Sequence, residues 1–130
     1  MNWLLLLAGA LSFAVLAGHL TVGRKQFLLP VLGLEGQAPL FKKGLHGMFH
    51  VATATFVVLA GGLLGLGLGV APLGAHAVVL APTIGLFYGS FAAVYLVLAS
   101  TSGIPGALGK MFQWIIFLAV AVLSVLGGRA

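Results

Sequence analysis

Cysteine is absent from this 130-residue sequence, and acidic residues are nearly so, because Glu35 is the only one. Without a thiol, the chain has no disulfide, no thiolate metal site and no cysteine nucleophile. A single acid also leaves no pair of carboxylates for acid–base catalysis, and no serine has a recognisable base and acid to activate it. No glycine-rich loop precedes a Lys-Ser or Lys-Thr pair, so a nucleotide site is not indicated either. The sequence therefore does not predict an enzyme.

Charge of either sign is scarce, since 5% of the residues are charged and 62% are hydrophobic. A soluble domain of this length cannot bury so much apolar surface, so the composition predicts a protein whose solvent is lipid. The net charge is +5, and the basic residues stand beside apolar segments. This placement predicts contact with the lipid bilayer and its anionic headgroups, and no binding of nucleic acid.

Long apolar segments fill most of the chain, and each is long enough to cross a bilayer as a helix. They run from about Trp3 to Val22, Leu45 to Val70, Gly74 to Ala99 and Leu108 to Gly127. Their interiors lack charged residues, and they do not alternate as the strands of a membrane barrel would. The sequence predicts an all-α membrane protein, with a single domain built as an up-down bundle of four transmembrane helices.

Basic residues gather on one predicted side of the membrane: Arg24, Lys25, Lys42, Lys43 and Lys110. The opposite side carries only Arg129, near the C-terminus. The positive-inside rule therefore predicts that both termini lie outside and that the two longer loops lie in the cytoplasm. We expect the longest loop, Gly23–Gly44, to rest on the headgroup layer, because it mixes basic and apolar residues.

Small residues at four-residue spacing predict how the helices pack, because membrane helices associate through close contact of small side chains. The second segment carries Gly61, Gly65 and Gly69 at this spacing. The first segment carries Ala10, Ala14 and Gly18 in the same way, and the third carries Gly85 and Gly89. The helical pitch places His46 and His50 on the same face as Gly61. We therefore expect this face to be buried and both imidazoles to point into the bundle.

Polar side chains from several helices fall at one predicted depth in the cytoplasmic leaflet. Neutral imidazole is a common ligand of transition metals and of haem, and His46 and His50 lie one helical turn apart. The sequence predicts a metal site formed by His19, His46 and His50, in a cofactor pocket that also includes Tyr95. The ligand is a metal ion, or a haem held from opposite sides by His19 and by either His46 or His50.

Other interpretations remain open at this stage. The histidines can be structural, forming hydrogen bonds between helices or to headgroups, or they can take part in proton or quinone chemistry with a redox partner. The chain can be a small-solute or ion transporter, which would assemble as a homo-oligomer through its glycine-rich faces. It can also be a scaffold or assembly subunit of a larger membrane complex, because an apolar helix bundle is sufficient for that role.

The first half of the chain contains a set of short motifs: Gly18-His19, Gly23-Arg24, Pro30, and Phe49-His50 followed by Thr53. This set resembles a pattern in small, uncharacterised bacterial four-helix membrane proteins. The resemblance implies a protein of the bacterial inner membrane and draws attention to His19 and His50. The sequence departs from the pattern at Arg24-Lys25, where that family has an acidic residue near the basic turn. The resemblance implies no particular activity.

Overall fold

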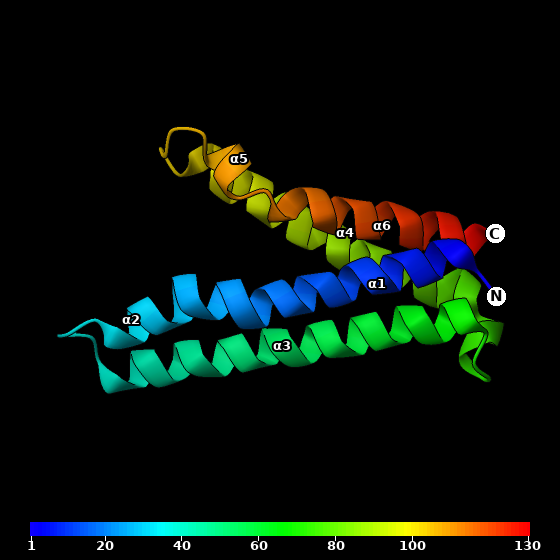
Figure 1. Ribbon diagram of the computed structural model, residues 1–130, viewed down its shortest axis with the longest axis horizontal. Coiled ribbons are helices and arrows are strands. Elements are labelled where there is room, and N and C mark those ends of the chain that lie inside the picture. Colours follow the sequence, from blue (N-terminus) through cyan, green and yellow to red (C-terminus); the bar gives the residue numbers. More distant parts are fainter.

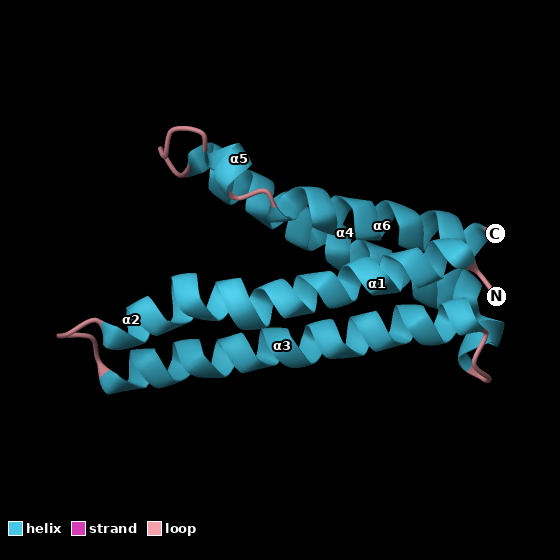
Figure 2. Cartoon of the chain, viewed as in Figure 1, coloured by secondary structure: helices cyan, strands magenta, loops and turns pink.

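Helices account for nearly all of the regular structure, and there is no strand. The computed structural model describes residues 1–130 (Figures 1 and 2). The helices are α1 (Trp3–Gly18), the π-helix η1 (His19–Leu28), α2 (Leu29–Gly33), α3 (Pro39–Leu68), the 3-10 helix η2 (Leu73–His76), α4 (Ala77–Thr101), α5 (Ala107–Lys110) and α6 (Gln113–Arg129). The predicted all-α class is confirmed.

Three continuous helical stretches are long and apolar enough to cross a membrane: Trp3–Gly33, Pro39–Leu68 and Leu73–Thr101. The last helix, α6, is also apolar but has 17 residues, slightly fewer than the roughly 20 that span the hydrocarbon. It begins later than predicted, because residues 107–110 form the separate short helix α5. Helices of membrane-crossing length are therefore present in three of the four predicted segments.

The predicted loop Gly23–Gly44 is wrong, because most of this segment is helical. The first helical stretch continues through η1 and α2 to Gly33, and α3 already begins at Pro39. Gly36 adopts a φ of 77° in the tight connection, a conformation that glycine reaches without steric cost. Pro39 occupies the first position of α3, where its missing N–H costs no helical hydrogen bond. The two long helices thus form an extended hairpin.

The helices are arranged as two antiparallel hairpins. In the first hairpin (residues 3–68) α1 packs against α3, and in the second (residues 77–129) α4 packs against α6. The hairpins meet mainly through α1 and α6, near the end where both termini lie (Figure 1). We call this the terminal end. Away from it the hairpins diverge toward separate tips, so the up-down order is kept but the helices do not close into a bundle along their whole length.

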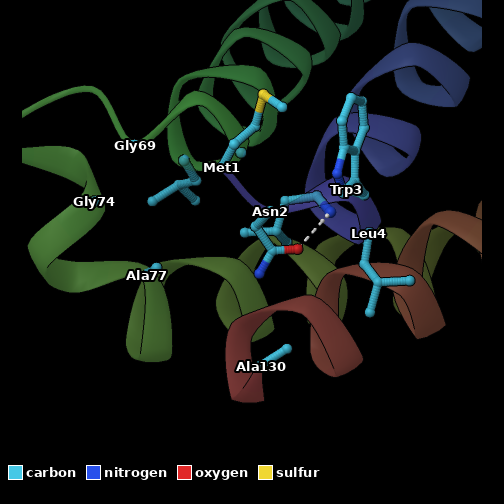
Figure 3. Close-up of a pocket in the computed structure, with 11 residues that line it drawn as sticks. Met1, Asn2, Trp3, Leu4, Gly69, Gly74, Ala77 and Ala130 are labelled. Atoms are coloured by element: carbon cyan, nitrogen blue, oxygen red, sulfur yellow. Dashed lines mark hydrogen bonds between the residues drawn. The ribbon is translucent and has the colours of Figure 1, made fainter.

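Asn2 ties three helices together at the terminal end. Its side-chain oxygen accepts a hydrogen bond from the N–H of Leu5 (3.2 Å), which caps α1. Its side-chain nitrogen donates to the carbonyl of Gly127 in α6 (2.7 Å), and its backbone N–H donates to the carbonyl of Gly67 in α3 (2.8 Å). Beside it lies a cavity of about 480 Å³ whose lining includes Met1 and Ala130 (Figure 3). The start of α1 is therefore held level with the ends of α3 and α6.

An aromatic cluster fills the space where the hairpins begin to separate. The rings of Phe56, Tyr88, Phe91 and Phe117 lie 5.8–6.4 Å apart between centroids. The hydroxyl of Tyr88, which is fully buried, is hydrogen-bonded to that of Ser12 in α1. These residues come from all four long helices, so the cluster closes the shared core on the side away from the termini.

Glycines allow the helix backbones to approach closely at Gly85, as predicted, and at Gly67, which the four-residue spacing does not single out. A Cβ atom on Gly67 would lie 2.9 Å from the backbone nitrogen of Leu6, and one on Gly85 would lie 2.9 Å from the carbonyl oxygen of Ala121. Gly61 is exposed, with nothing within 4 Å of a Cβ there. The expectation that the Gly61 face is buried is therefore wrong.

Gly85→Ala and Gly61→Ala form a matched pair of variants, because both glycines lie inside long helices. We expect Gly85→Ala to lower the free energy of unfolding by about 1–3 kcal/mol, since the new methyl group collides with backbone atoms of α6. Gly61→Ala should leave it unchanged or raise it by up to about 1 kcal/mol, through helix propensity alone. Unfolding of the purified protein in detergent measures both. Equal effects would contradict the close α4–α6 approach.

Candidate functional site

His19 lies at the start of η1 and faces α3. Its Nε2 atom is 3.1 Å from the hydroxyl oxygen of Thr53 and 3.2 Å from the carbonyl oxygen of Phe49. The imidazole stacks on the ring of Phe49, with centroids 4.0 Å apart and planes inclined by 19°, and meets the edge of Phe56 at 5.4 Å. His19 is thus a contact between the two helices of the first hairpin.

The hydrogen bonds of His19 determine which of its nitrogens carries a proton. The carbonyl of Phe49 can only accept, so Nε2 must donate. The hydroxyl of Thr53 donates to the same carbonyl (3.0 Å) and accepts from Nε2, which is consistent with this assignment. A protonated Nε2 cannot bind a metal ion, and only Nδ1 is left for that purpose.

His46 and His50 form a pair on the exposed side of α3. Their Nε2 atoms are 3.1 Å apart, and their ring centroids are 4.7 Å apart. When both rings are neutral, one Nε2 donates and the other accepts. The four-residue spacing brings the rings together, as the sequence predicts, but the residues are exposed and do not point into a core.

The structure does not bring the three predicted metal ligands together. Nowhere does the chain gather three His, Cys, Asp or Glu side chains that could hold a metal ion. His19 is bonded to Thr53 between the helices, whereas His46 and His50 pair on an exposed face. The three-histidine centre therefore separates into an interhelical contact and an exposed pair.

The predicted haem arrangement does not fit these residues. A haem held by two histidines needs one imidazole on each face of the porphyrin plane. The Nε2 of His19 is engaged by Thr53 and Phe49. His46 and His50 lie side by side on one helix, so they cannot stand on opposite faces of a ring.

Tyr95 belongs to the second hairpin and joins no histidine. Its ring contacts that of Phe117 at 5.5 Å, beside the aromatic cluster. Gln113 lies one helical turn before Phe117, and its buried side-chain oxygen has no hydrogen-bond partner. The polar groups predicted to share one pocket are therefore divided between two hairpins that diverge at this level (Figure 1).

Sequence reasoning missed the polar contact between Ser12 and Tyr88 in the core and the bonds that Asn2 makes to neighbouring helices at the terminal end. Ser12 shares a face of α1 with buried Leu5, Ala8 and Leu16, and Tyr88 shares a face of α4 with Ala81 and Ala92. The sequence did contain a signal for this contact. Each of two apolar helix faces carries one hydroxyl, and a buried hydroxyl requires a hydrogen-bond partner. The role of Asn2 could be foreseen only in part, since its position predicts a cap but not the bonds to α3 and α6.

Comparisons with known proteins bear on neither the histidine pair nor the interhelical contact. The chain matches no protein-family model, no curated protein and no solved structure. The resemblance of the first half of the chain to small bacterial membrane proteins stays a prediction. Function must therefore be argued from the residues themselves.

Thr53→Val tests the interhelical contact with nearly unchanged side-chain shape. We expect it to lower the free energy of unfolding by about 0.5–1.5 kcal/mol, because His19 loses one of its two acceptors. Thr55→Val is the matched control, since Thr55 bonds only to the carbonyl of Val51 within α3. The measurement is unfolding in detergent. If the two variants are destabilised equally, His19 and Thr53 do not hold the hairpin together.

Proposed function

We propose that this chain is a bacterial inner-membrane protein that crosses the bilayer four times and binds a transition-metal ion through His46 and His50. Support for the membrane location comes from three apolar helices of sufficient length. The splayed tips and the apolar α6 are compatible with a fourth crossing, because a helix slightly shorter than the hydrocarbon is accommodated at small cost. Under this proposal, both hairpin tips face the cytoplasm and both termini lie outside.

The distribution of charge supports this orientation. Arg24 and Lys25 lie in η1 and Lys42 and Lys43 in the first turns of α3, so all four belong to the tip of the first hairpin. Lys110 lies at the end of α5, at the tip of the second. Only Arg129 lies at the terminal end, and basic residues favour the cytoplasmic side.

The lengths of the helices give a depth for the histidine pair. The stretch Trp3–Gly33 has 31 residues, which at about 1.5 Å per residue exceeds a hydrocarbon layer about 30 Å thick. Gly67 of α3 is level with Asn2. Counting back roughly 20 residues from Gly67 reaches the neighbourhood of His46 and His50. The pair therefore falls at the edge of the hydrocarbon, within reach of water and ions from the cytoplasm.

The observation that supports metal binding most directly is the separation of the two Nε2 atoms. Metal–imidazole bonds are about 2.0–2.1 Å long, so two cis ligands of one ion are roughly 2.9–3.4 Å apart at angles between 90° and tetrahedral. The observed 3.1 Å lies within this range. Water would complete the coordination of an ion held by two protein ligands.

The surroundings of the pair decide which ion it would prefer. Imidazole suits Zn²⁺, Cu²⁺ and Ni²⁺, whereas Mg²⁺ and Ca²⁺ require oxygen ligands. No carboxylate flanks the pair, and Lys42 stands one turn before His46. The lysine charge opposes any cation, so the ion held must be one that imidazole binds strongly. The pair therefore favours Zn²⁺, Cu²⁺ or Ni²⁺ over the alkaline-earth ions.

Calorimetric titration of the purified protein with Zn²⁺, Ni²⁺, Mg²⁺ and Ca²⁺ tests the pair. We expect Zn²⁺ and Ni²⁺ to bind and Mg²⁺ and Ca²⁺ not to. The His50→Ala variant should bind Zn²⁺ at least about tenfold more weakly than the wild type. Acidification should also weaken binding, because imidazole must be neutral to act as a ligand. Lys42→Gln should strengthen binding. His76→Ala is the control, since His76 is exposed at the opposite end of the hairpin. Equal affinity in the wild type and in the doubly substituted His46→Ala, His50→Ala protein would rule out the proposed site.

Cysteine labelling tests the orientation on a chain that has no cysteine of its own. Gln37→Cys places a thiol in the tip of the first hairpin, and Ala75→Cys places one in η2 at the opposite end. In intact cells, a maleimide that cannot cross the membrane should label the cysteine at 75 and not the one at 37. The reverse pattern would invert the proposed topology, and labelling of both in intact cells would contradict membrane crossing.

The transport and scaffold alternatives stay predictions.

A further inference from the structure

The tip of the first hairpin holds an apolar groove between its two helices. The groove has a volume of about 280 Å³. Every residue lining it is hydrophobic: Phe27, Leu28, Val31, Leu45, Met48 and Phe49. No other part of the chain covers it, because 58% of the surface of Phe27 and 71% of that of Met48 remain exposed. An open groove of this kind can accept an apolar group from outside.

The position of the groove along the hairpin sets it at the membrane surface. Phe27 and Val31 follow the point, near Val22, at which roughly 20 residues of helix from Trp3 have crossed the hydrocarbon. On α3, Leu45 lies just before the histidine pair that marks the same edge. In the proposed topology, the groove therefore opens in the headgroup layer of the cytoplasmic leaflet, where phospholipid is the most concentrated ligand.

Basic residues stand at both ends of this groove. Arg24 lies one turn before Leu28 on the first helix, and Lys42 lies one turn before Leu45 on α3. Lys25 and Lys43 follow directly in sequence, so the tip of this hairpin carries four cations. The only acid of the chain, Glu35, can neutralise at most one of them. The groove thus combines an apolar floor with an excess of positive charge at its ends.

We propose that this groove binds an anionic phospholipid, with part of one acyl chain against Phe27 and Met48 and with the phosphate attracted by Arg24 and Lys42 at the ends of the groove. The guanidinium of an arginine forms paired hydrogen bonds with phosphate oxygens, and a lysine supplies a second charge. The volume is below the roughly 300–1,000 Å³ of pockets that enclose a whole small molecule. A short acyl segment fits, while the rest of the lipid stays in the bilayer.

The sign of the lipid charge follows from the excess of cations. A zwitterionic lipid carries its own ammonium group, which the lysines repel, whereas an anionic lipid gains attraction from each nearby cation. The proposal depends on the membrane location given above and is independent of metal binding by the histidine pair. Cysteine labelling tests the location separately, so failure of one claim is distinguishable from failure of the other.

The experiment measures binding of phosphatidylglycerol and of phosphatidylcholine to the protein in detergent, by native mass spectrometry and by the shift of the thermal unfolding temperature. We expect phosphatidylglycerol to bind and to raise that temperature, and phosphatidylcholine to do neither. The doubly substituted Arg24→Gln, Lys42→Gln protein should bind phosphatidylglycerol about thirtyfold more weakly, at about a factor of five for each cation. Lys110→Gln, which removes one charge from the second hairpin, is the control and should bind as the wild type does.

A second pair of variants distinguishes the contribution of the apolar floor to lipid affinity from the contribution of the cations. Met48→Gln should weaken phosphatidylglycerol binding, whereas Met48→Leu should preserve it, because only the first introduces a polar group into the floor. Met48 is largely exposed, so both variants should retain the fold. The proposal is overturned if both lipids bind equally, or if Lys110→Gln loses as much affinity as the doubly substituted protein. It is also overturned if glycerol phosphate or an acidic peptide binds as tightly as the lipid.

Discussion

Close approach of helix backbones at the terminal end is the constraint on which the rest of the structure depends. The bonds from Asn2 to Gly67 and Gly127 require α1, α3 and α6 to lie within hydrogen-bonding distance of one residue. That approach exists only because both acceptors are glycines. A Cβ atom on Gly127 would lie 2.6 Å from the side chain of Leu5, closer than real Cβ contacts. In lipid, where apolar side chains gain little by facing one another, such contacts and buried polar bonds hold helices together.

Because these contacts are concentrated at one end, the other end of each hairpin has to be stable by itself. The first hairpin achieves this through the contact of His19 with Thr53 and the stacking of His19 on Phe49. Its tip is consequently free of the second hairpin, and its outer surfaces remain available. The proposed metal pair and the proposed lipid groove are both complete within the first hairpin for this reason, and Tyr95 contributes to neither.

Composition and run length were sufficient to predict an all-helical chain, because they depend on sums over many residues. The predicted loop failed because it was defined by basic and polar residues between two apolar segments, and such residues do not end a helix. Wider π-helical turns pass Gly23, and Pro30 falls in the first turn of α2. Helix faces were harder to predict. The run of leucine and glycine from residue 61 to residue 69 has small residues on more than one face. Gly62, Gly65 and Gly67 meet neighbouring side chains closely, whereas Gly61 does not. Which face is buried depends on neighbours that spacing does not reveal.

Phe49 contributes both to the contact with His19 and to the apolar groove of the first hairpin. Its carbonyl accepts from His19, its ring stacks on the same imidazole, and that ring also lines the groove. The next residue, His50, is half of the exposed pair. An ion on the pair would add positive charge beside the cations of the groove and so favour an anionic headgroup there. Coupling between two sites is reciprocal, so a lipid phosphate in the groove would strengthen ion binding by the same factor. Neutralising Lys42, which repels the ion and attracts the phosphate, would therefore change the two affinities in opposite directions.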